Sequence, residues 1–239
     1  MQKADRDGLI GILSKEPVAN CGFLEYLDAY ELVRSGICGS SCGAVFQVGE
    51  DRWGALSSRL EEEAKELSFL FDGMLNVAIS PAFSWSADAA LGGRKPDCIL
   101  HCTLMHLPDG AQIGKASADA VHIGPEYAET VYRNYKRASA VSLDYIKERL
   151  DNGPSIGTFR DGALVGWALT HDDFSMGMLT VLPEYRRQGI ALDMTLALIE
   201  ELRRLGKRPI AHIEKGNGMS MPLVRKLGFQ EVCDIIFLG

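Results

Sequence analysis

The sequence predicts an α/β protein built around a mixed sheet, and three observations predict it. Short apolar runs typical of strands alternate with amphipathic stripes typical of helices. In the second half these segments follow one another as strand, strand, strand, helix, strand, helix and strand, an order that favours a mixed sheet. The chain has 239 residues, 46% of them hydrophobic and 24% charged, which is the composition of a folded protein with a sizeable core.

Residues 1–117 are predicted to form an α/β domain that carries no catalytic motif. Apolar residues at helical spacing (Phe23, Leu27, Tyr30) predict a helix over about 17–35. A second apolar stripe runs from Trp53 to Phe71 and predicts a helix that ends at Asp72-Gly73. Strands are expected at about Ala44–Val48, Leu75–Ile79 and Cys98–Leu107.

The stretch from Pro108 to about Ala120 is rich in Gly, Ala, Ser and Asp, has no hydrophobic period and predicts a domain boundary. Residues 118–239 are then a second domain. Its expected elements are helices at about Pro125–Tyr135 and Ser142–Leu150, strands at Ser155–Phe159, Leu164–His171 and Ser175–Leu182, a helix over Gly189–Leu205, a strand at Ile210–Glu214, a helix at Met219–Leu227 and a strand at Glu231–Leu238. The long helix is expected to bury the stripe Met194, Leu198, Leu202 and Leu205.

The net charge of −7 lies in the first half: residues 1–125 hold 17 acidic and 10 basic side chains, and residues 126–239 hold 15 of each. An acidic first half argues against nucleic acid as the main partner. The charged start of the chain is unlike a secretory peptide, and no apolar run is long enough for a membrane helix. We therefore expect a cytoplasmic protein, a monomer or homodimer, that binds neither nucleic acid nor a membrane.

A metal site is not expected from the sequence. The six cysteines lack the short paired spacing of a zinc ribbon or a redox motif. Cys98, Cys102 and His106 are spaced like ligands, but they fall in a predicted strand, where four residues span about 13 Å, too far for one ion.

The most informative segment is the turn that joins a predicted strand to the long helix, from Val181 to Leu192. The backbone N–H groups of Arg187 to Leu192 would have no partner within the helix, and the helix dipole adds partial positive charge there. Gly189 and Ala191 leave room for phosphate oxygens to approach the backbone, and Arg186 adds charge. The turn therefore predicts a pyrophosphate site, although arginine-rich turns at helix starts also occur without a ligand.

This turn reads Arg186-Arg187-Gln188-Gly189-Ile190-Ala191 after Val181-Leu182-Pro183, and it resembles the pyrophosphate loop of the GNAT superfamily of acyltransferases. A second stretch, Asn217 followed by Ser220, Leu223 and Lys226-Leu227-Gly228-Phe229, resembles the second GNAT signature. The resemblance covers about residues 120–239 and implies a GNAT fold with acetyl-CoA or another acyl-CoA as co-substrate. It assigns acyl-CoA binding to Leu179, Thr180, Val181, Arg186, Arg187, Gln188, Gly189, Ile190, Ala191, Leu192 and Asn217.

The nearest resemblance within the superfamily is to the glycine N-acyltransferase-like branch. It rests on Leu182-Pro183-Glu184-Tyr185-Arg186, on Trp167, and on His212-Ile213-Glu214 before Asn217. In such proteins the first half is a degenerate, GNAT-like α/β copy of the same fold that helps to shape the acceptor pocket. The resemblance implies the same role for the first half of this chain.

The implied reaction transfers an acyl group to a primary amine of a small molecule, with an amino acid as one candidate. A primary amine has a pKa of about 10 in water and is protonated at neutral pH, so a base must take its proton during attack on the thioester. The first candidate is His212, where relatives often place a base, and a histidine packed between strand and helix is the alternative. Asp172 and Asp173 are the rival bases, beside His171, unless they form a solvated turn. The resemblance implies a backbone N–H at about Leu179–Val181 as the oxyanion donor.

Two positions depart from the family pattern. Val224 stands where many relatives carry a tyrosine that protonates the departing thiolate, so Tyr132 or Tyr135 would have to replace it unless both are core aromatics. Ser175 stands where glycine N-acyltransferases carry a glutamate base, which puts glycine in doubt as the acceptor. A peptide or protein amine therefore remains an alternative acceptor, and a CoA-binding sensor or scaffold without turnover is the alternative function.

Overall fold

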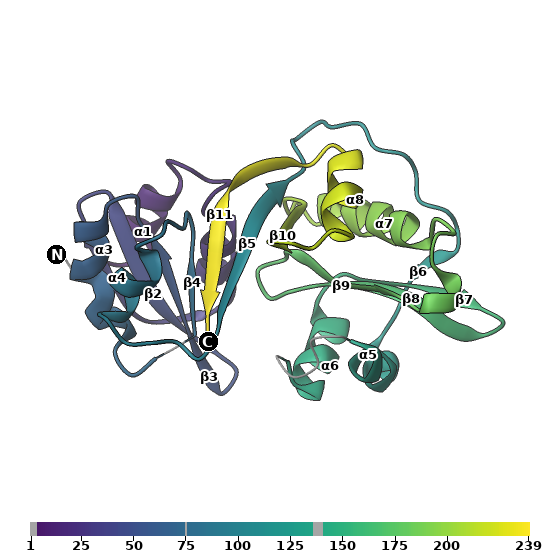
Figure 1. Ribbon diagram of the computed structural model, residues 1–239, viewed down its shortest axis with the longest axis horizontal. Helices are drawn as coiled ribbons and strands as arrows, with labels where there is room; N and C mark the ends of the chain where they lie inside the picture. Colours follow the sequence, from purple (N-terminus) through teal and green to yellow (C-terminus); the bar gives the residue numbers. More distant parts are fainter. Residues whose placement is uncertain (1–3, 75, 136–140) are drawn as a thin grey trace. The chain divides into compact units, whose positions relative to one another are not determined.

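The computed structural model describes residues 4–74, 76–135 and 141–239, and the chain divides into two compact units (Figure 1). The first unit comprises Met1–Met105, His212–Ser220 and Glu231–Gly239. The second comprises His106–Ala211 and Met221–Gln230. Two C-terminal segments therefore belong to the same compact unit as the N-terminal residues. The division into functional domains at 117/118 stays a prediction.

The first unit is built on a mixed sheet that has seven strands among the described residues, in the order β1-β2-β3-β4-β11-β5-β10. Neighbouring pairs β1–β2 and β2–β3 are antiparallel, β3–β4 is parallel and β4–β11 is antiparallel. The sheet therefore joins strands from both ends of the chain. The strands are β1 (Glu31–Cys38), β2 (Ser41–Val48), β3 (Asp51–Ser57), β4 (Val77–Ile79), β5 (Ile99–His106), β10 (Ile210–Glu214) and β11 (Gln230–Leu238).

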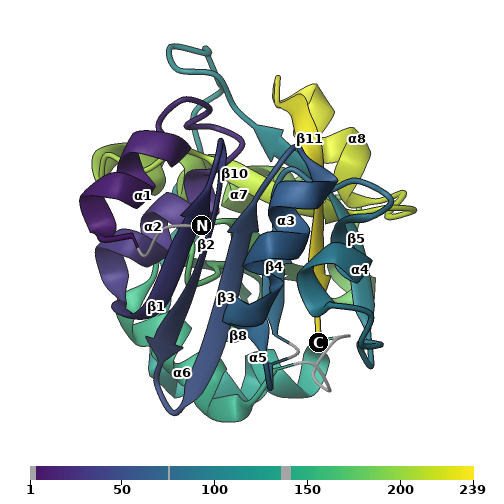
Figure 2. The same cartoon turned by 90° about the vertical axis from the view of Figure 1, so that its left-hand side faces the viewer.

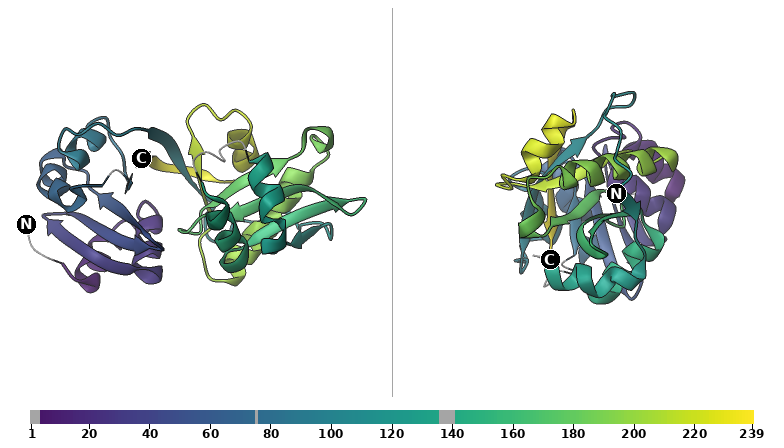
Figure 3. Two further views of the ribbon diagram at one scale, coloured as in Figure 1. Left: turned by 90° about the horizontal axis from the view of Figure 1, so that it is seen from below. Right: turned by 90° about the vertical axis from the view of Figure 1, so that its right-hand side faces the viewer.

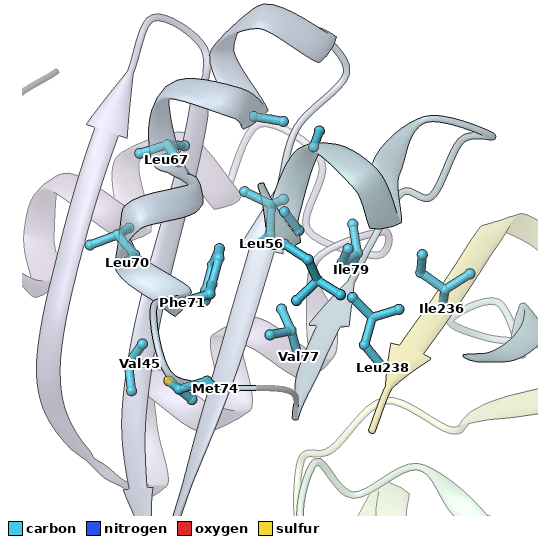
Figure 4. Close-up of a cluster of buried hydrophobic side chains, with 14 residues drawn as sticks. Val45, Leu56, Leu67, Leu70, Phe71, Met74, Val77, Ile79, Ile236 and Leu238 are labelled. Atoms are coloured by element: carbon cyan, nitrogen blue, oxygen red, sulfur yellow. The ribbon is translucent and has the colours of Figure 1, made fainter. Parts of the chain in front are cut away.

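Helices cover both faces of this sheet (Figure 2). Because side chains alternate along a strand, Phe46 of β2 packs with α1 (Arg6–Leu13) and α2 (Cys21–Ala29), whereas Val45 packs on the other face. That other face is covered by α3 (Glu61–Leu67), η1 (Ser68–Phe71) and α4 (Ser86–Leu91). Ile236 and Leu238 of β11 lie in the same apolar cluster (Figure 4), so the C-terminal strand completes this core.

The second unit contains an antiparallel sheet of β6 (Ala120–His122), β7 (Ser155–Arg160), β8 (Ala163–Thr170) and β9 (Met176–Val181). One face carries α7 (Ile190–Arg204), which packs on Val165 and Ala168 of β8. The other face carries α5 (Ala128–Asn134) and α6 (Leu143–Asn152), which pack on Trp167 and Leu169 (Figure 3). The remaining elements are η2 (Pro125–Tyr127), η4 (Pro183–Tyr185) and α8 (Ser220–Lys226).

The elements expected after residue 140 match the structure to within a few residues, but two expected helices in the first half are wrong in part. The helix expected over 17–35 ends at Ala29, and the chain continues as β1. The helix expected from Trp53 begins only at Glu61, because residues 51–57 form β3 and pair with β2. Leu75, the first residue of an expected strand, lies outside the described residues.

Two further findings concern single features. Leu205, expected in the buried stripe of α7, is 42% exposed because the helix ends at Arg204. In the described parts of the chain, no helix has the length and apolar character needed to cross a membrane, and no group of three or more His, Cys, Asp or Glu side chains is placed to hold a metal ion.

Candidate active site

The turn between β9 and α7 has a fixed backbone. The N–H of Leu182 donates to the carbonyl of Val165 on β8 (2.9 Å), and Pro183 then begins the short helix η4. The Arg186 guanidinium donates through Nε to the carbonyl of Val181 (2.9 Å), which ties the turn back to the end of β9. The chain then enters α7 through Gly189, whose φ of 86° is in the left-handed region that glycine adopts without steric cost.

The start of α7 presents a run of backbone donors. Gly189 is the N-cap and no side chain caps the helix; the first helical hydrogen bond runs from Asp193 N–H to the Gly189 carbonyl (3.0 Å). For the N–H groups from Arg187 to Leu192, the structure records no acceptor among the described residues. A Cβ added to Gly189 would meet nothing within 4 Å. This combination of free amides and open space is suited to an anion such as a pyrophosphate.

The strand that leads into this turn contains a β-bulge. Trp167 pairs with Thr180 and Leu169 pairs with Gly177, so Met178 and Leu179 of β9 lie opposite one residue of β8. Met178 has a φ of 50°, which is rare for a residue with a side chain. A bulge disrupts the ladder locally and leaves a residue unpaired. Of the predicted site residues, Leu179 lies in this bulge, and Thr180 and Val181 follow it and lead to the turn.

A buried polar cluster lies where β8 turns into β9. Asp172 is 7%, Asp173 5% and Ser175 1% exposed, so the two rival bases do not form a solvated turn. The carboxylate of Asp173 accepts a hydrogen bond from the Ser175 N–H (2.9 Å). Asp172 Oδ1 and Ser175 Oγ are buried and have no hydrogen-bond partner among the described residues. Polar atoms in this state are rare in folded proteins and mark the cluster as a functional candidate.

Helix α6 adds two side chains to this cluster. The Tyr145 hydroxyl lies 3.1 Å from His171 Nδ1, and the charge of the nearby Asp172 acts on its pKa. The Arg149 guanidinium donates to the His171 carbonyl (3.1 Å). Neither Tyr145 nor Arg149 was predicted from the sequence as a site residue. A signal was present, because Arg149 shares a helix face with the apolar residue Ile146 and is buried with it.

Burial shifts the protonation of this cluster. Burial lowers the pKa of His171 below its usual 6.5, although the nearby carboxylates Asp173 and Asp172 act in the opposite direction. Burial, together with the charge of Asp172, raises the pKa of Tyr145 well above 10. Burial opposes the charge of Arg149, but its hydrogen bond to Glu148 raises the arginine pKa overall. Near neutral pH the histidine is therefore uncharged and the tyrosine keeps its proton.

The other predicted site residues, His212 and Asn217, belong to the first compact unit. His212 is partly buried on β10, and its ring centre lies 5.1 Å from that of Phe237. Asn217 Oδ1 accepts hydrogen bonds from the N–H groups of Met219 (3.2 Å) and Ser220 (3.1 Å), so it caps the start of α8. A site that joins His212 and Asn217 to the turn at Gly189 stays a prediction.

The two tyrosines considered as thiolate donors, Tyr132 and Tyr135, pack against the apolar cluster beneath α5 and α6. Val224 is buried in α8. The structure thus brings the turn at Gly189, the bulge and the buried polar cluster together on one sheet, and the two tyrosines are partly buried against the apolar cluster of that sheet.

Comparisons with known proteins identify the fold. A family model described as FR47-like protein matches residues 155–237. A solved Drosophila protein is 17% identical, with a TM-score of 0.74, over 100% of this chain and 98% of that chain. A GCN5-related N-acetyltransferase from Kribbella flavida is 14% identical, with a TM-score of 0.60, over 93% of each chain. A tandem GNAT protein from the clavulanic acid biosynthesis pathway is 16% identical, with a TM-score of 0.50, over 98% of this chain and 95% of that chain.

No curated protein sequence matches the chain. The solved structures are too distant in sequence to carry more than the fold, which is the mixed α/β GNAT fold that the sequence predicted.

Proposed function

We propose that this chain is an acyl-CoA-dependent N-acyltransferase that moves an acetyl or another short acyl group to the primary amine of a small molecule, such as an amino acid. The observation that carries the proposal is the run of free amides from Arg187 to Leu192 at an uncapped helix start. The GNAT fold and the bulge in the preceding strand support it. An anion held at these amides would be followed along β9 by the rest of the acyl-CoA.

The proposed binding roles follow the chain from the turn. Arg186, Arg187 and Gln188 are exposed beside the amides, so their side chains can add hydrogen bonds and charge to a pyrophosphate. Ile190, Ala191 and Leu192 supply backbone N–H groups. Asn217 is the proposed pantetheine contact. Its Oδ1 accepts the hydrogen bonds that cap α8, and no described residue is recorded as accepting from its amide nitrogen, which can therefore donate to a ligand.

The proposed chemistry needs a proton acceptor and an oxyanion donor. His212, Asp172 and Asp173 are the candidate acceptors from the sequence. A backbone N–H among Leu179 to Val181 is the proposed oxyanion donor, because the bulge disturbs the ladder there and a freed N–H can point at the thioester oxygen.

Three finer assignments belong to the same proposal. Leu182-Pro183-Glu184-Tyr185-Arg186 supports the glycine N-acyltransferase-like branch, and the likeness to a tandem GNAT protein supports a GNAT-like N-terminal domain in residues 1–117. No disulfide joins the six cysteines, all of which lie in the described parts of the chain, and this state is typical of the reducing cytoplasm, where we place the reaction.

The test combines ligand binding with turnover. Acetyl-CoA should raise the melting temperature, since a ligand at a hundred times its Kd adds about 2.7 kcal/mol of stability. A panel of amino acids, small amines and peptides, assayed for free thiol, should then identify the acceptor class. No stabilisation by acetyl-CoA would contradict the proposal. Stabilisation without turnover would instead support a CoA-binding sensor, the function that Val224 in place of a tyrosine favours.

A further inference from the structure

The imidazole of His171 lies against β9 immediately before the bulge. A Cβ added to Gly177 would lie 2.3 Å from His171 Nε2, so the ring occupies the space that any side chain at this position would need. Gly177 directly precedes Met178, the first residue of the bulge. The Nε2 atom therefore lies beside Gly177, two residues before the segment Leu179–Val181 that we propose as the oxyanion donor.

His171 is oriented by its contact with Tyr145. The Tyr145 hydroxyl lies 3.1 Å from His171 Nδ1, and the charge of the nearby Asp172 acts on it. A carboxylate nearby favours a hydroxyl proton directed towards it, which leaves the hydroxyl oxygen to accept from an N–H at His171 Nδ1. This arrangement assigns the proton of the neutral imidazole to Nδ1 and leaves a lone pair on Nε2. The two rings also stack, with 6.4 Å between their centres and 25° between their planes.

The Nε2 atom of His171 differs from the oxygens of the neighbouring carboxylates in its partners and its burial. No described residue hydrogen-bonds His171 Nε2, and the atom is not among the fully buried ones that lack a partner. Asp173 accepts from the Ser175 N–H, and Asp172 Oδ1, which has no described partner, is fully buried. Of these groups we assign the acceptor role to His171, because its Nε2 carries a lone pair and is neither hydrogen-bonded by a described residue nor fully buried.

We propose that His171 is the general base of the acyl transfer, with Tyr145 and Asp172 as positioning residues; this inference rests on the proposed N-acyltransferase function. The acceptor amine reacts in its neutral form, after the extra proton of the ammonium has passed to solvent. Its lone pair forms a bond to the thioester carbonyl carbon, the π electrons of the carbonyl move to the oxygen, and one N–H proton moves to His171 Nε2. The oxyanion then re-forms the carbonyl as the carbon–sulfur bond breaks, and the electron pair of that bond leaves with the CoA sulfur as a thiolate. The proton on His171 can pass to that thiolate or to water, which returns the imidazole to its neutral form.

The electrostatic surroundings fit this role. His171 faces Asp172 and Asp173 on its own turn and Tyr145 and Arg149 on α6. Burial keeps the pKa of the free imidazole below 6.5, so it is unprotonated at pH 7 and ready to accept. The carboxylates stabilise the imidazolium that forms during the reaction, which opposes the effect of burial.

The experiment compares His171→Gln with His122→Gln, the same substitution at an exposed histidine of the same sheet. We expect His171→Gln to lower kcat/KM at pH 7 by about 100-fold or more, the usual contribution of a general base. The acidic limb of the wild-type pH profile, where activity falls as His171 is protonated, should disappear. His122→Gln should keep the wild-type kcat/KM and the acidic limb of the pH profile. A His171→Gln enzyme that retains the acidic limb or loses less than about threefold in kcat/KM would overturn the proposal.

The contact between the Tyr145 hydroxyl and His171 Nδ1 is tested by Tyr145→Phe, which keeps the stacked ring but removes the hydroxyl. We expect kcat to fall about tenfold with KM for acetyl-CoA unchanged, because the imidazole loses the partner that fixes its tautomer. In histidine NMR spectra, the wild type should show one imidazole that is protonated at Nδ1, and the resonances of this imidazole should shift in Tyr145→Phe. The same resonance should titrate at the pKa of the acidic limb. An Nε2 proton on this ring, or a titration pKa that differs from that of the acidic limb, would rule out His171 as the general base even if His171→Gln failed to fold.

These outcomes separate the two proposals. If wild-type protein turns over no amine, the N-acyltransferase function fails and the inference fails with it. If wild type is active and His171→Gln is equally active, only the assignment of His171 is lost, and His212→Ala then tests the base predicted from the sequence.

Discussion

Two glycines at opposite ends of α7 allow the proposed pyrophosphate site to be tested residue by residue. Gly189 (φ 86°) and Gly206 (φ 70°) are both left-handed, and a Cβ at either would meet nothing within 4 Å. Gly189→Val and Gly206→Val should therefore each cost about 1–2 kcal/mol of stability. Only the first should raise the Kd for CoA, by at least about tenfold, because its side chain would stand over the free amides. Calorimetric titration of both variants makes the comparison, and equal Kd values would place the pyrophosphate elsewhere.

A second pair of glycines tests the position of His171. Gly177→Ala would put a methyl 2.3 Å from His171 Nε2, and Gly157→Ala would put one 2.6 Å from an Ile123 methyl. Both overpack the second unit at a cost of about 1–3 kcal/mol. If His171 acts as the base, Gly177→Ala should lower kcat at least about tenfold, whereas Gly157→Ala should leave it near wild type once the protein is folded. Comparable activity in the two variants would count against this geometry.

At the scale of elements, α7 supports the amide run by packing on the sheet. Leu198 is 1% exposed in its buried stripe, whereas Leu205, just beyond the helix, is 42% exposed. Leu198→Ala should lower the free energy of unfolding by about 2–5 kcal/mol, and Leu205→Ala by less than about 0.5 kcal/mol. Urea unfolding measures both. A stable Leu198→Ala protein would mean that the helix is held mainly by other contacts.

The elements that the sequence predicted well are those whose signals are local. The strands and helices after residue 140 are bounded by turns such as Asp161-Gly162 and follow one hydrophobic period each, so pattern and structure agree. Trp53 and Leu56 fit a helical stripe equally well, but residues 54–57 of β3 are buried one after another, so the strand shows no alternation. Its pairing with β2 decided the outcome, and a short apolar window does not contain that information.

The candidate site also shows that a sequence pattern predicts only what consecutive residues determine. The turn at Gly189 was predicted because its residues are consecutive. The link between Tyr145 and His171 was missed, because it spans 26 residues and depends on how α6 packs on the sheet.

At the scale of the whole molecule, two histidines make stability depend on pH. Burial lowers the pKa of both His106 and His171 below 6.5. Between that value and the folded-state pKa, the unfolded chain binds more protons than the native protein, so the free energy of unfolding should decrease as pH falls from 7 through 6. Glu63 and Glu201 also have lowered pKa values, but they act only below about 4.5. Urea unfolding at pH 7.0 and 5.5 should show the loss, and His171→Gln should reduce it; identical midpoints would contradict this linkage.

The first unit depends on residues from the far end of the chain. In β11, Ile236 pairs with Ile79 and Leu238 with Val77 of β4, and both complete the cluster under α3 and α4. Residues 1–117 expressed alone should therefore lack cooperative unfolding, since one edge of β4 would be unpaired and the apolar cluster under α3 and α4 would be open to water. Adding residues 118–239 in trans should restore it. A fragment 1–117 that folds alone, judged by NMR dispersion and calorimetry, would show that the C-terminal strands are dispensable.

The position of β11 between β4 and β5 also sets the order of events on the ribosome. The strands β1 to β5 emerge before β11, and until then their sheet has a gap at the position that β11 fills. At about 5–20 residues per second, the more than a hundred residues between β5 and β11 take roughly 5–20 seconds or more to synthesise. During that interval the apolar edge of β4 is open to wrong partners, so nascent chains should need chaperones until β11 has emerged.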